Sequence, residues 1–194
     1  MSTVTQTLRS WALHELVADP RSRAGVALVA FVLATGFGAQ VAVPLPWTPV
    51  PITLQPFFVI VAGAVLGARL GASAMVAYVI VGALGAPVFS NGASGLAWLM
   101  GPTGGYLLAT PAAAFVTGCV AGREAGKARI LAGLTLGVAA LYAGGLAQLA
   151  LLTGRDLGGL LALGVWPFLA GDATKVLAAL AVVPALRRTS LGRF

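Results

Sequence analysis

Charged residues are scarce in this sequence of 194 residues, and their scarcity argues against an ordinary soluble protein. Only 9% of the residues are Asp, Glu, Lys or Arg, whereas 59% are hydrophobic and the mean hydropathy is +0.96. Soluble globular domains carry about 25% charged residues. The composition therefore indicates an integral membrane protein, and its length allows about six crossings of ~20 residues each.

Metal-ligating and redox side chains are also almost absent. The only cysteine, Cys119, excludes an internal disulfide and a cysteine-based zinc or iron–sulfur site. The only histidine, His14, excludes a histidine-rich metal site, so no cofactor is expected. The net charge of +7 would suit a nucleic-acid partner. However, the basic residues stand at the ends of apolar runs rather than on one soluble face, so no nucleic acid is expected to bind.

Long uncharged stretches determine the expected fold. Residues 24–68 contain no charged side chain, and neither do residues 70–122. Each stretch is too long for one crossing and is interrupted by a patch rich in proline or glycine, so each predicts a pair of helices. With two further apolar runs near the C-terminus, the fold class expected is an all-α membrane protein, a bundle of six transmembrane helices. The predicted spans are residues 24–42, 53–68, 70–86, 104–122, 130–152 and 165–186.

Basic residues indicate how this bundle is oriented. Nearly all of them lie before the first span, after the last span, or in the connections at residue 69 and at residues 123–129. Because cytoplasmic segments are enriched in Lys and Arg, we expect these segments and both termini in the cytoplasm. Residues 1–23 then form a cytoplasmic segment with an interfacial helix on membrane lipid. Residues 24–186 form the transmembrane domain, and residues 187–194 form a basic cytoplasmic tail.

Two uncharged connections lie on the opposite, external side. Residues 43–51 contain four prolines, which favour a stiff extended loop, and residues 85–105 are rich in glycine. Solvated loops of this length usually carry charge, so we expect both to fold back over the bundle. Irregular backbone at membrane depth is tolerated where it lines a cavity. The pattern therefore predicts a pocket that is open to the outside and covered by these two loops.

Asp172 and Lys175 stand three residues apart inside the last apolar run, so a helix places them on one face within pairing distance. A charged side chain at membrane depth costs at least ~2.5 kcal/mol on insertion scales and is expected to face the bundle interior. The pair is either part of a binding site or a structural link between helices. The functional interpretation is favoured because ionisable groups within spans usually mark a site.

Small residues recur at four-residue spacing on the first span, at Ala30, Ala34 and Gly38. Glycines follow the same spacing around residue 67. Such stripes allow helices to approach closely, either within the bundle or with a partner, which includes a second copy of this chain as a homo-oligomer.

Three motifs resemble those of a known family. They are Pro49-Val50-Pro51-Ile52-Thr53-Leu54-Gln55 after the first span, Gly101-Pro102-Thr103-Gly104-Gly105-Tyr106 before the fourth, and Phe168-Leu169-Ala170-Gly171-Asp172 with Lys175 in the sixth. In this order and spacing they resemble BioY, the family of biotin-binding S components of energy-coupling factor (ECF) transporters, over residues 24–186. Ala170 departs from the family pattern, which often has proline there, and this should affect local kinking more than chemistry.

The resemblance implies a protein that is not an enzyme: a six-helix subunit in the bacterial plasma membrane that captures biotin from outside for uptake. It also implies partners, namely an ECF transmembrane coupling subunit and ABC-type ATPases. The sequence has no Walker A pattern, so any ATP hydrolysis must come from those partners. Similar alanine motifs in other S components make Ala30, Ala34 and Gly38 a candidate surface for the coupling subunit.

The expected site is centred on the charged pair. Asp172 can accept hydrogen bonds from the ureido N–H groups of biotin, and Lys175 can donate to the ureido oxygen or to the carboxylate. The other candidate ligand-binding residues lie at the outer ends of the spans: Asn91, Thr53, Gln55, Thr103, Gly104, Gly105 and Tyr106.

Several of these residues have structural alternatives. Thr53 and Thr103 are equally suited to capping a helix, and Asn91 to forming a turn. Gln148 in the fifth span is a further polar contact or an interhelical link. Four aromatic residues are candidates for the apolar wall of the site or for anchors at the membrane interface: Trp47, Phe89, Trp98 and Trp166.

Three other functions are compatible with parts of the pattern. An S component for another small vitamin would share most features, although the Asp172–Lys175 pair suits a ureido group. A membrane-embedded enzyme usually needs several carboxylates for metal or base roles, and this chain has only Asp172 at membrane depth. A purely structural subunit would retain no ligand after purification.

Overall fold

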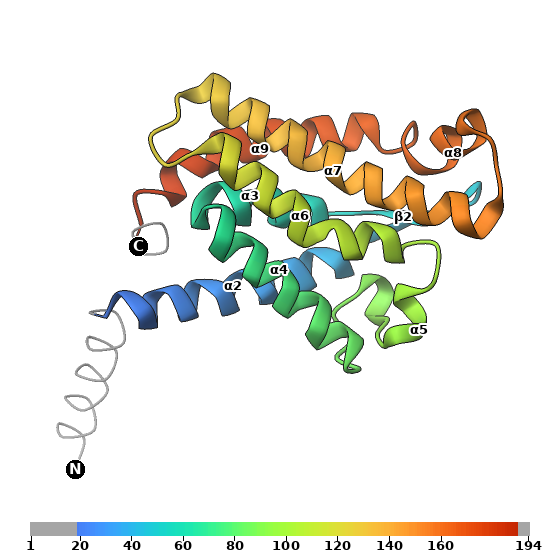
Figure 1. Cartoon of the computed structure of the whole chain (residues 1–194), viewed down its shortest axis with the longest axis horizontal. Coiled ribbons are helices and arrows are strands. Elements are labelled where there is room, and N and C mark those ends of the chain that lie inside the picture. Colours follow the sequence, from blue (N-terminus) through green and yellow to red (C-terminus); the bar gives the residue numbers. More distant parts are fainter. Residues whose placement is uncertain (1–18, 190–194) are drawn as a thin grey trace, which may run out of the picture.

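The computed structural model describes residues 19–189, which form a bundle of helices with a short β-hairpin at one end (Figure 1). In chain order the elements are α2 (Pro20–Gln40), β1 (Ala42–Leu45), β2 (Thr48–Thr53), α3 (Gln55–Leu66), α4 (Ala68–Ala83), the 3-10 turn η1 (Ser90–Gly92), α5 (Leu96–Leu99), α6 (Gly104–Ala121), α7 (Lys127–Thr153), α8 (Leu157–Gly164) and α9 (Leu169–Leu186). The predicted helical membrane protein is confirmed at this level.

The predicted number of spans is only partly supported. Within the described residues, α2, α6, α7 and α9 are long and apolar enough to cross a membrane. Helices α3 and α4 are apolar but shorter, at 12 and 16 residues. The short α3 results from the preceding hairpin, which takes up residues that were assigned to the first connection and to the start of the second span.

Three helices begin at other residues than predicted, and in each case a charged residue or a proline lies near the helix start. Helix α2 begins at Pro20 rather than at residue 24, because Asp19 caps it by accepting a hydrogen bond from the Ser22 N–H at 3.2 Å. Helix α7 begins at Lys127 rather than at residue 130, since a solvated first turn tolerates the basic residues that an apolar span excludes. Helix α9 begins at Leu169 rather than at residue 165, after a turn that contains Pro167.

The proline-rich segment is a two-stranded antiparallel hairpin, whereas the sequence predicted an extended loop without pairing. Ala42 lies opposite Thr53 and Leu45 opposite Thr48, with an irregular register at Pro44. Each strand of a two-stranded sheet has one free edge, so prolines can occupy positions whose missing N–H needs no partner. The extended backbone was therefore predicted correctly, and the strand pairing was not.

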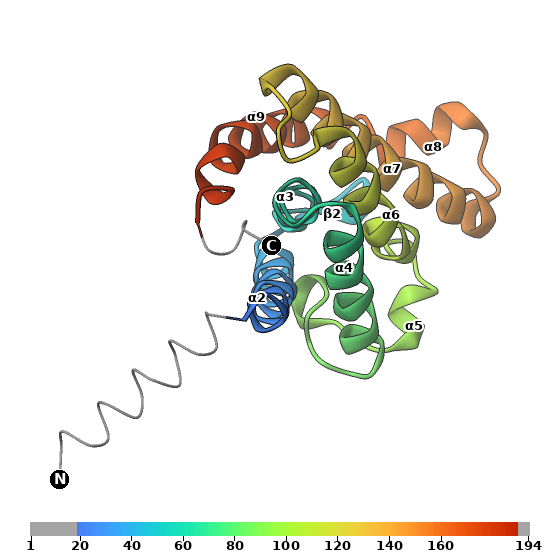
Figure 2. The same cartoon turned by 60° about the vertical axis from the view of Figure 1, so that its left-hand side comes forward.

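Helix α3 lies at the centre of the bundle, with α2, α4, α6 and α9 around it (Figure 2). Nine of its twelve residues are buried, as expected for a helix that is apolar on all sides. Gly63 lies against the backbone of Ala114 on α6, and Gly71 of α4 lies against Gly63. Gly67, with φ of 83°, turns the chain between α3 and α4. The glycine stripe around residue 67 thus serves packing within the bundle.

The bundle has two chemically different ends (Figure 1). The start of α2, the α3–α4 junction, the α6–α7 connection and the end of α9 lie together at one end, and these segments carry the clustered basic residues. The hairpin, α5 and α8 lie at the opposite end. The expected interfacial helix before residue 19 and the tail after residue 189 lie outside the described residues. The cytoplasmic location of the basic end stays a prediction.

Candidate functional site

A cavity lies at the hairpin end of the bundle, where the first turn of α3 meets α6, α7 and α9. The empty space within it, including open solvent at its mouth, is about 650 Å³. Its polar lining residues are Thr53, Gln55, Ser90, Thr103, Tyr106, Thr110, Tyr142, Asp172 and Lys175. Its apolar lining residues are Val50, Pro51, Pro56, Val59, Leu107, Leu141 and Phe168.

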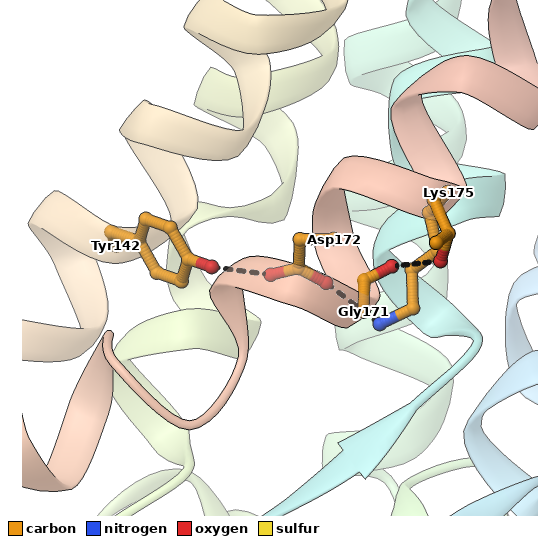
Figure 3. A network of polar contacts seen from close by, with 5 residues as sticks. Tyr142, Gly171, Asp172 and Lys175 are labelled. Atoms are coloured by element: carbon orange, nitrogen blue, oxygen red, sulfur yellow. Dashed lines mark hydrogen bonds and ion pairs between the residues drawn. The ribbon is translucent and has the colours of Figure 1, made fainter.

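The predicted charged pair forms the most polar part of this cavity. The Nζ atom of Lys175 lies 2.7 Å from Oδ1 of Asp172, and both residues are buried, with exposed fractions of 8% and 6% (Figure 3). Asp172 sits in the first turn of α9, where the positive end of the helix dipole stabilises a carboxylate. A buried charge without a partner is strongly unfavourable, so each member of the pair offsets part of the cost of burying the other.

Tyr142 of α7 completes the polar group. Its hydroxyl donates a hydrogen bond of 2.6 Å to Oδ2 of Asp172, the oxygen that Lys175 leaves free (Figure 3). Tyr142 is not among the residues predicted from the sequence. Its available signal was weak: a tyrosine within an apolar span, whose hydroxyl needs a partner when buried.

Four more predicted residues line the cavity with this group: Thr53, Gln55, Thr103 and Tyr106. Gln55 is buried in the first turn of α3, and neither Thr53 nor Thr103 caps a helix with its side chain. The hydroxyl of Tyr106 donates to the Gly164 carbonyl at 2.7 Å, so this group is already committed to holding the end of α8. Six of the nine predicted ligand-binding residues therefore meet around one cavity.

The other three do not line it. Asn91 is exposed and adopts the left-handed conformation with φ of 58°, as a turn residue does, whereas its buried neighbour Ser90 faces the cavity. Gly104 and Gly105 bring α6 close to Leu99 and to α7. A direct role of these three residues toward a ligand stays a prediction.

None of the four suggested aromatic residues lines the cavity. Trp47 and Trp166 are each 62% exposed and Trp98 is 36% exposed, as expected for membrane-interface anchors. Phe89 is fully buried and packs edge-to-face on Tyr78, away from the cavity lining. Phe168, a residue of the third motif, lines the cavity together with the charged pair.

Both uncharged connections contribute to the cavity lining, Val50 and Pro51 from the first and Ser90 and Thr103 from the second, and each connection is held by a specific side chain. The Oγ1 atom of Thr48 in the hairpin donates to the Leu163 carbonyl at 2.7 Å, which joins the hairpin to α8. At the end of α2, the Gln40 amide donates to the Phe89 carbonyl at 3.0 Å and accepts from the Gly92 N–H at 2.9 Å. The Gln148 amide donates to the carbonyls of Leu99 and Gly101, so it serves as a link rather than a cavity contact.

This arrangement suits binding of an uncharged polar group next to an apolar body. The carboxylate accepts hydrogen bonds, the ammonium donates them, and the surrounding wall is mostly hydrocarbon. Among the described residues, no three His, Cys, Asp or Glu side chains come together in a way that could hold a metal ion.

Comparison with known proteins places the chain in a family. The profile described as "BioY family" matches residues 9–191. The protein named "Probable biotin transporter BioY" from Pyrococcus horikoshii is 47% identical over 163 residues, which cover 84% of this chain and 94% of that protein. "Biotin transporter BioY" from Thermotoga maritima is 37% identical over 156 residues, covering 80% and 90%.

A solved structure has the same fold. It is described as the S-component for biotin from an ECF-type ABC transporter, and it aligns with a TM-score of 0.73 and 23% sequence identity over 97% of this chain and 95% of that chain. At this identity the likeness is one of fold, and it agrees with the family assignment from sequence. This chain belongs to the BioY family.

Proposed function

We propose that this chain is a biotin-binding membrane subunit for biotin uptake, an S component of an ECF transporter. The observation that carries the proposal is the buried Asp172–Lys175 pair in the lining of the cavity. Relatives named as biotin transporters that match nearly their full length support the same assignment.

The chemistry of the cavity fits the chemistry of biotin. The ureido ring offers N–H donors to the Asp172 carboxylate and a carbonyl oxygen to the Lys175 ammonium, which retains donors beyond the one given to Asp172. Charge-assisted bonds of this kind are the stronger ones. The thioether ring and the valerate chain are apolar and would lie against Val59, Leu141 and Phe168.

Protein groups alone satisfy the charged pair. Asp172 accepts hydrogen bonds from Lys175 and Tyr142, so neither charge is left unpaired in the interior. A ligand would replace or add to hydrogen bonds of side chains that are already in place, so binding would cost little free energy of reorganisation.

Partners follow from the same proposal. The cavity lies at the end of the bundle opposite the basic residues, so a cytoplasmic basic end directs the cavity outward. A coupling subunit would contact the small residues of α2, of which Ala30 and Ala34 are half-buried. Gly38 is buried against Phe58, so we assign it to packing within the chain and restrict the proposed surface to the two alanines.

Calorimetry with purified protein in detergent tests the proposal. The wild type should bind biotin with a nanomolar Kd, about −12 kcal/mol. Asp172→Asn and Lys175→Met should each lose about 2–5 kcal/mol, because truncating one partner leaves the other charge buried and unpaired. The double variant removes both charges, and Thr174→Ala is the matched control, since Thr174 is exposed on the same helix and bonds only to the Gly171 carbonyl.

The outcomes separate the alternatives. Unchanged binding in correctly folded single and double variants would make the pair structural and would remove the central observation. A wild-type protein that ignores biotin but retains another vitamin would favour an S component of different specificity. A protein that retains no small molecule would favour a structural subunit.

A further inference from the structure

Tyr142 differs from the other two tyrosines of the chain in what its hydroxyl contacts. Tyr78 and Tyr106 donate to the backbone carbonyls of Val88 and Gly164, at 2.8 and 2.7 Å. Tyr142 instead donates to the Asp172 carboxylate at 2.6 Å and lines the cavity. Its hydrogen bond therefore joins α7 directly to the charged pair on α9.

This contact determines which atoms donate and which accept at the polar end of the cavity. A tyrosine hydroxyl carries one proton, and here that proton points to Oδ2 of Asp172. The phenolic oxygen is then left with acceptor capacity only, and the carboxylate accepts in any case. Along the row in Figure 3, Tyr142 and Asp172 are hydrogen-bond acceptors toward a ligand, and Lys175 is the donor.

The same contact fixes the carboxylate in space. Among the described residues, two side chains donate to Asp172, one to each oxygen: Lys175 to Oδ1 at 2.7 Å and Tyr142 to Oδ2 at 2.6 Å. A carboxylate held by donors on both oxygens and from two helices has little freedom to rotate. Its remaining lone pairs therefore point in fixed directions, and a group that is fixed before binding discriminates between ligands more sharply.

We infer that Tyr142 is a specificity-determining residue: it holds Asp172 so that this corner of the cavity accepts N–H donors and rejects ligands that present an acceptor or an N-alkyl group there. The inference rests on the proposed function, since it assigns the N–H donors to the cyclic urea of biotin. An analogue without the matching N–H leaves the buried carboxylate short of a bond, and unmatched buried polar groups are the strongest source of discrimination.

A double-mutant cycle between protein and ligand tests the inference. The protein change is Tyr142→Phe, which removes one oxygen and keeps the ring. The ligand change is methylation of one ureido nitrogen of biotin, made separately at each nitrogen. In the wild type, the isomer methylated at the nitrogen that faces Asp172 should bind at least 100-fold more weakly than biotin. In Tyr142→Phe, biotin itself should bind about tenfold more weakly and the penalty for methylation should fall about tenfold, because the two groups act through one carboxylate.

Thr117→Val is the matched control, because it removes a buried hydroxyl whose bond is to the Ala113 backbone carbonyl within α6, and Thr117 does not line the cavity. This variant should show the wild-type affinity for biotin and the wild-type penalty for methylation. Melting temperatures of both variants measure the structural part of each change separately.

Each result decides something. If Tyr142→Phe weakens biotin and methylated biotin by the same factor, the two changes are additive, Tyr142 contributes only to structure, and the inference is overturned. Unchanged biotin affinity in Tyr142→Phe overturns it as well, while the proposed function stands. A wild-type protein that does not bind biotin overturns the proposed function and, with it, this inference.

Discussion

Replacing Arg187 with glutamine is expected to destabilise the basic end of the bundle, because this one side chain joins three helices there. The sequence places Arg187 in a basic tail, but its guanidinium folds back onto the helix ends. It donates to the Ala64 carbonyl through Nε and Nη2 at 3.0 and 2.8 Å, to the Ala121 carbonyl at 2.9 Å and to the Arg123 carbonyl at 3.1 Å. The Ala64 and Ala121 carbonyls lie in the last turns of α3 and α6, where backbone carbonyls lack partners within the helix, and the Arg123 carbonyl lies in the connection after α6.

The magnitude follows from the number and kind of these bonds. A buried hydrogen bond to a charged group contributes about 1.5–3 kcal/mol. Arg187 is only half-buried, so water replaces part of what is lost, and we expect a total of about 2–4 kcal/mol for its four bonds. Burial and the nearby charge of Arg123 lower the pKa of Arg187, yet guanidinium stays protonated at neutral pH and the bonds persist.

Thermal unfolding in detergent, followed by size-exclusion chromatography of heated samples, measures the effect. At about 2–4 °C per kcal/mol for a chain of this size, Arg187→Gln should lower the apparent Tm by about 5–15 °C. Arg187→Lys keeps the charge but loses the planar fork, so its loss should be intermediate. Arg188→Gln is the matched control, since Arg188 is exposed and the change removes the same charge from the same helix end. Equal Tm values for Arg187→Gln and Arg188→Gln would refute the reasoning.

Two further predictions concern the cover of the cavity and the partner surface. Gln40→Met keeps the size of the side chain but removes its hydrogen bonds to residues 85–95, which together contribute about 1–2 kcal/mol. Biotin should then dissociate about tenfold faster in a radiolabel chase. An unchanged dissociation rate would show that this segment does not retain the ligand. Ala34→Leu should abolish co-purification with a coupling subunit, while the affinity for biotin stays at the wild-type value. Ala139→Leu, at an exposed alanine of α7, is the control. Assembly with the coupling subunit in both variants would contradict the proposed surface.

Hydropathy predicted the helices because each one must cover its backbone with apolar side chains at membrane depth. It could not predict the ends, which depend on local chemistry: Asp19 caps α2, and the turn at Pro167 separates α8 from α9. The hairpin was missed for a related reason. Proline composition shows that Pro44 and Pro51 are extended, but strand pairing depends on which segments meet, and a single chain contains no direct signal of that.

The site was predictable only where its residues contradicted their surroundings. Asp172 and Lys175 were found because a charge within an apolar run requires an explanation. Phe168 and Val59 match the composition of every other wall in the bundle, so nothing in the sequence distinguishes them. Tyr142 is intermediate: its hydroxyl needs a partner, but the sequence does not show that the partner is Asp172 on another helix.

The short central helix explains why the cavity exists at all. Twelve residues of α3 span only ~18 Å, whereas a hydrocarbon core is about 30 Å thick. The surrounding helices α6, α7 and α9 are long enough to cross a membrane. At the hairpin end they therefore extend beyond α3, and no central helix fills the space between them. The first two turns of α3, with Gln55 and Val59, line the resulting space, as do Val50 and Pro51 of the hairpin. The prolines that end the helical pattern after α2 therefore keep α3 short, and this shortness leaves the charged pair facing a cavity instead of a packed core.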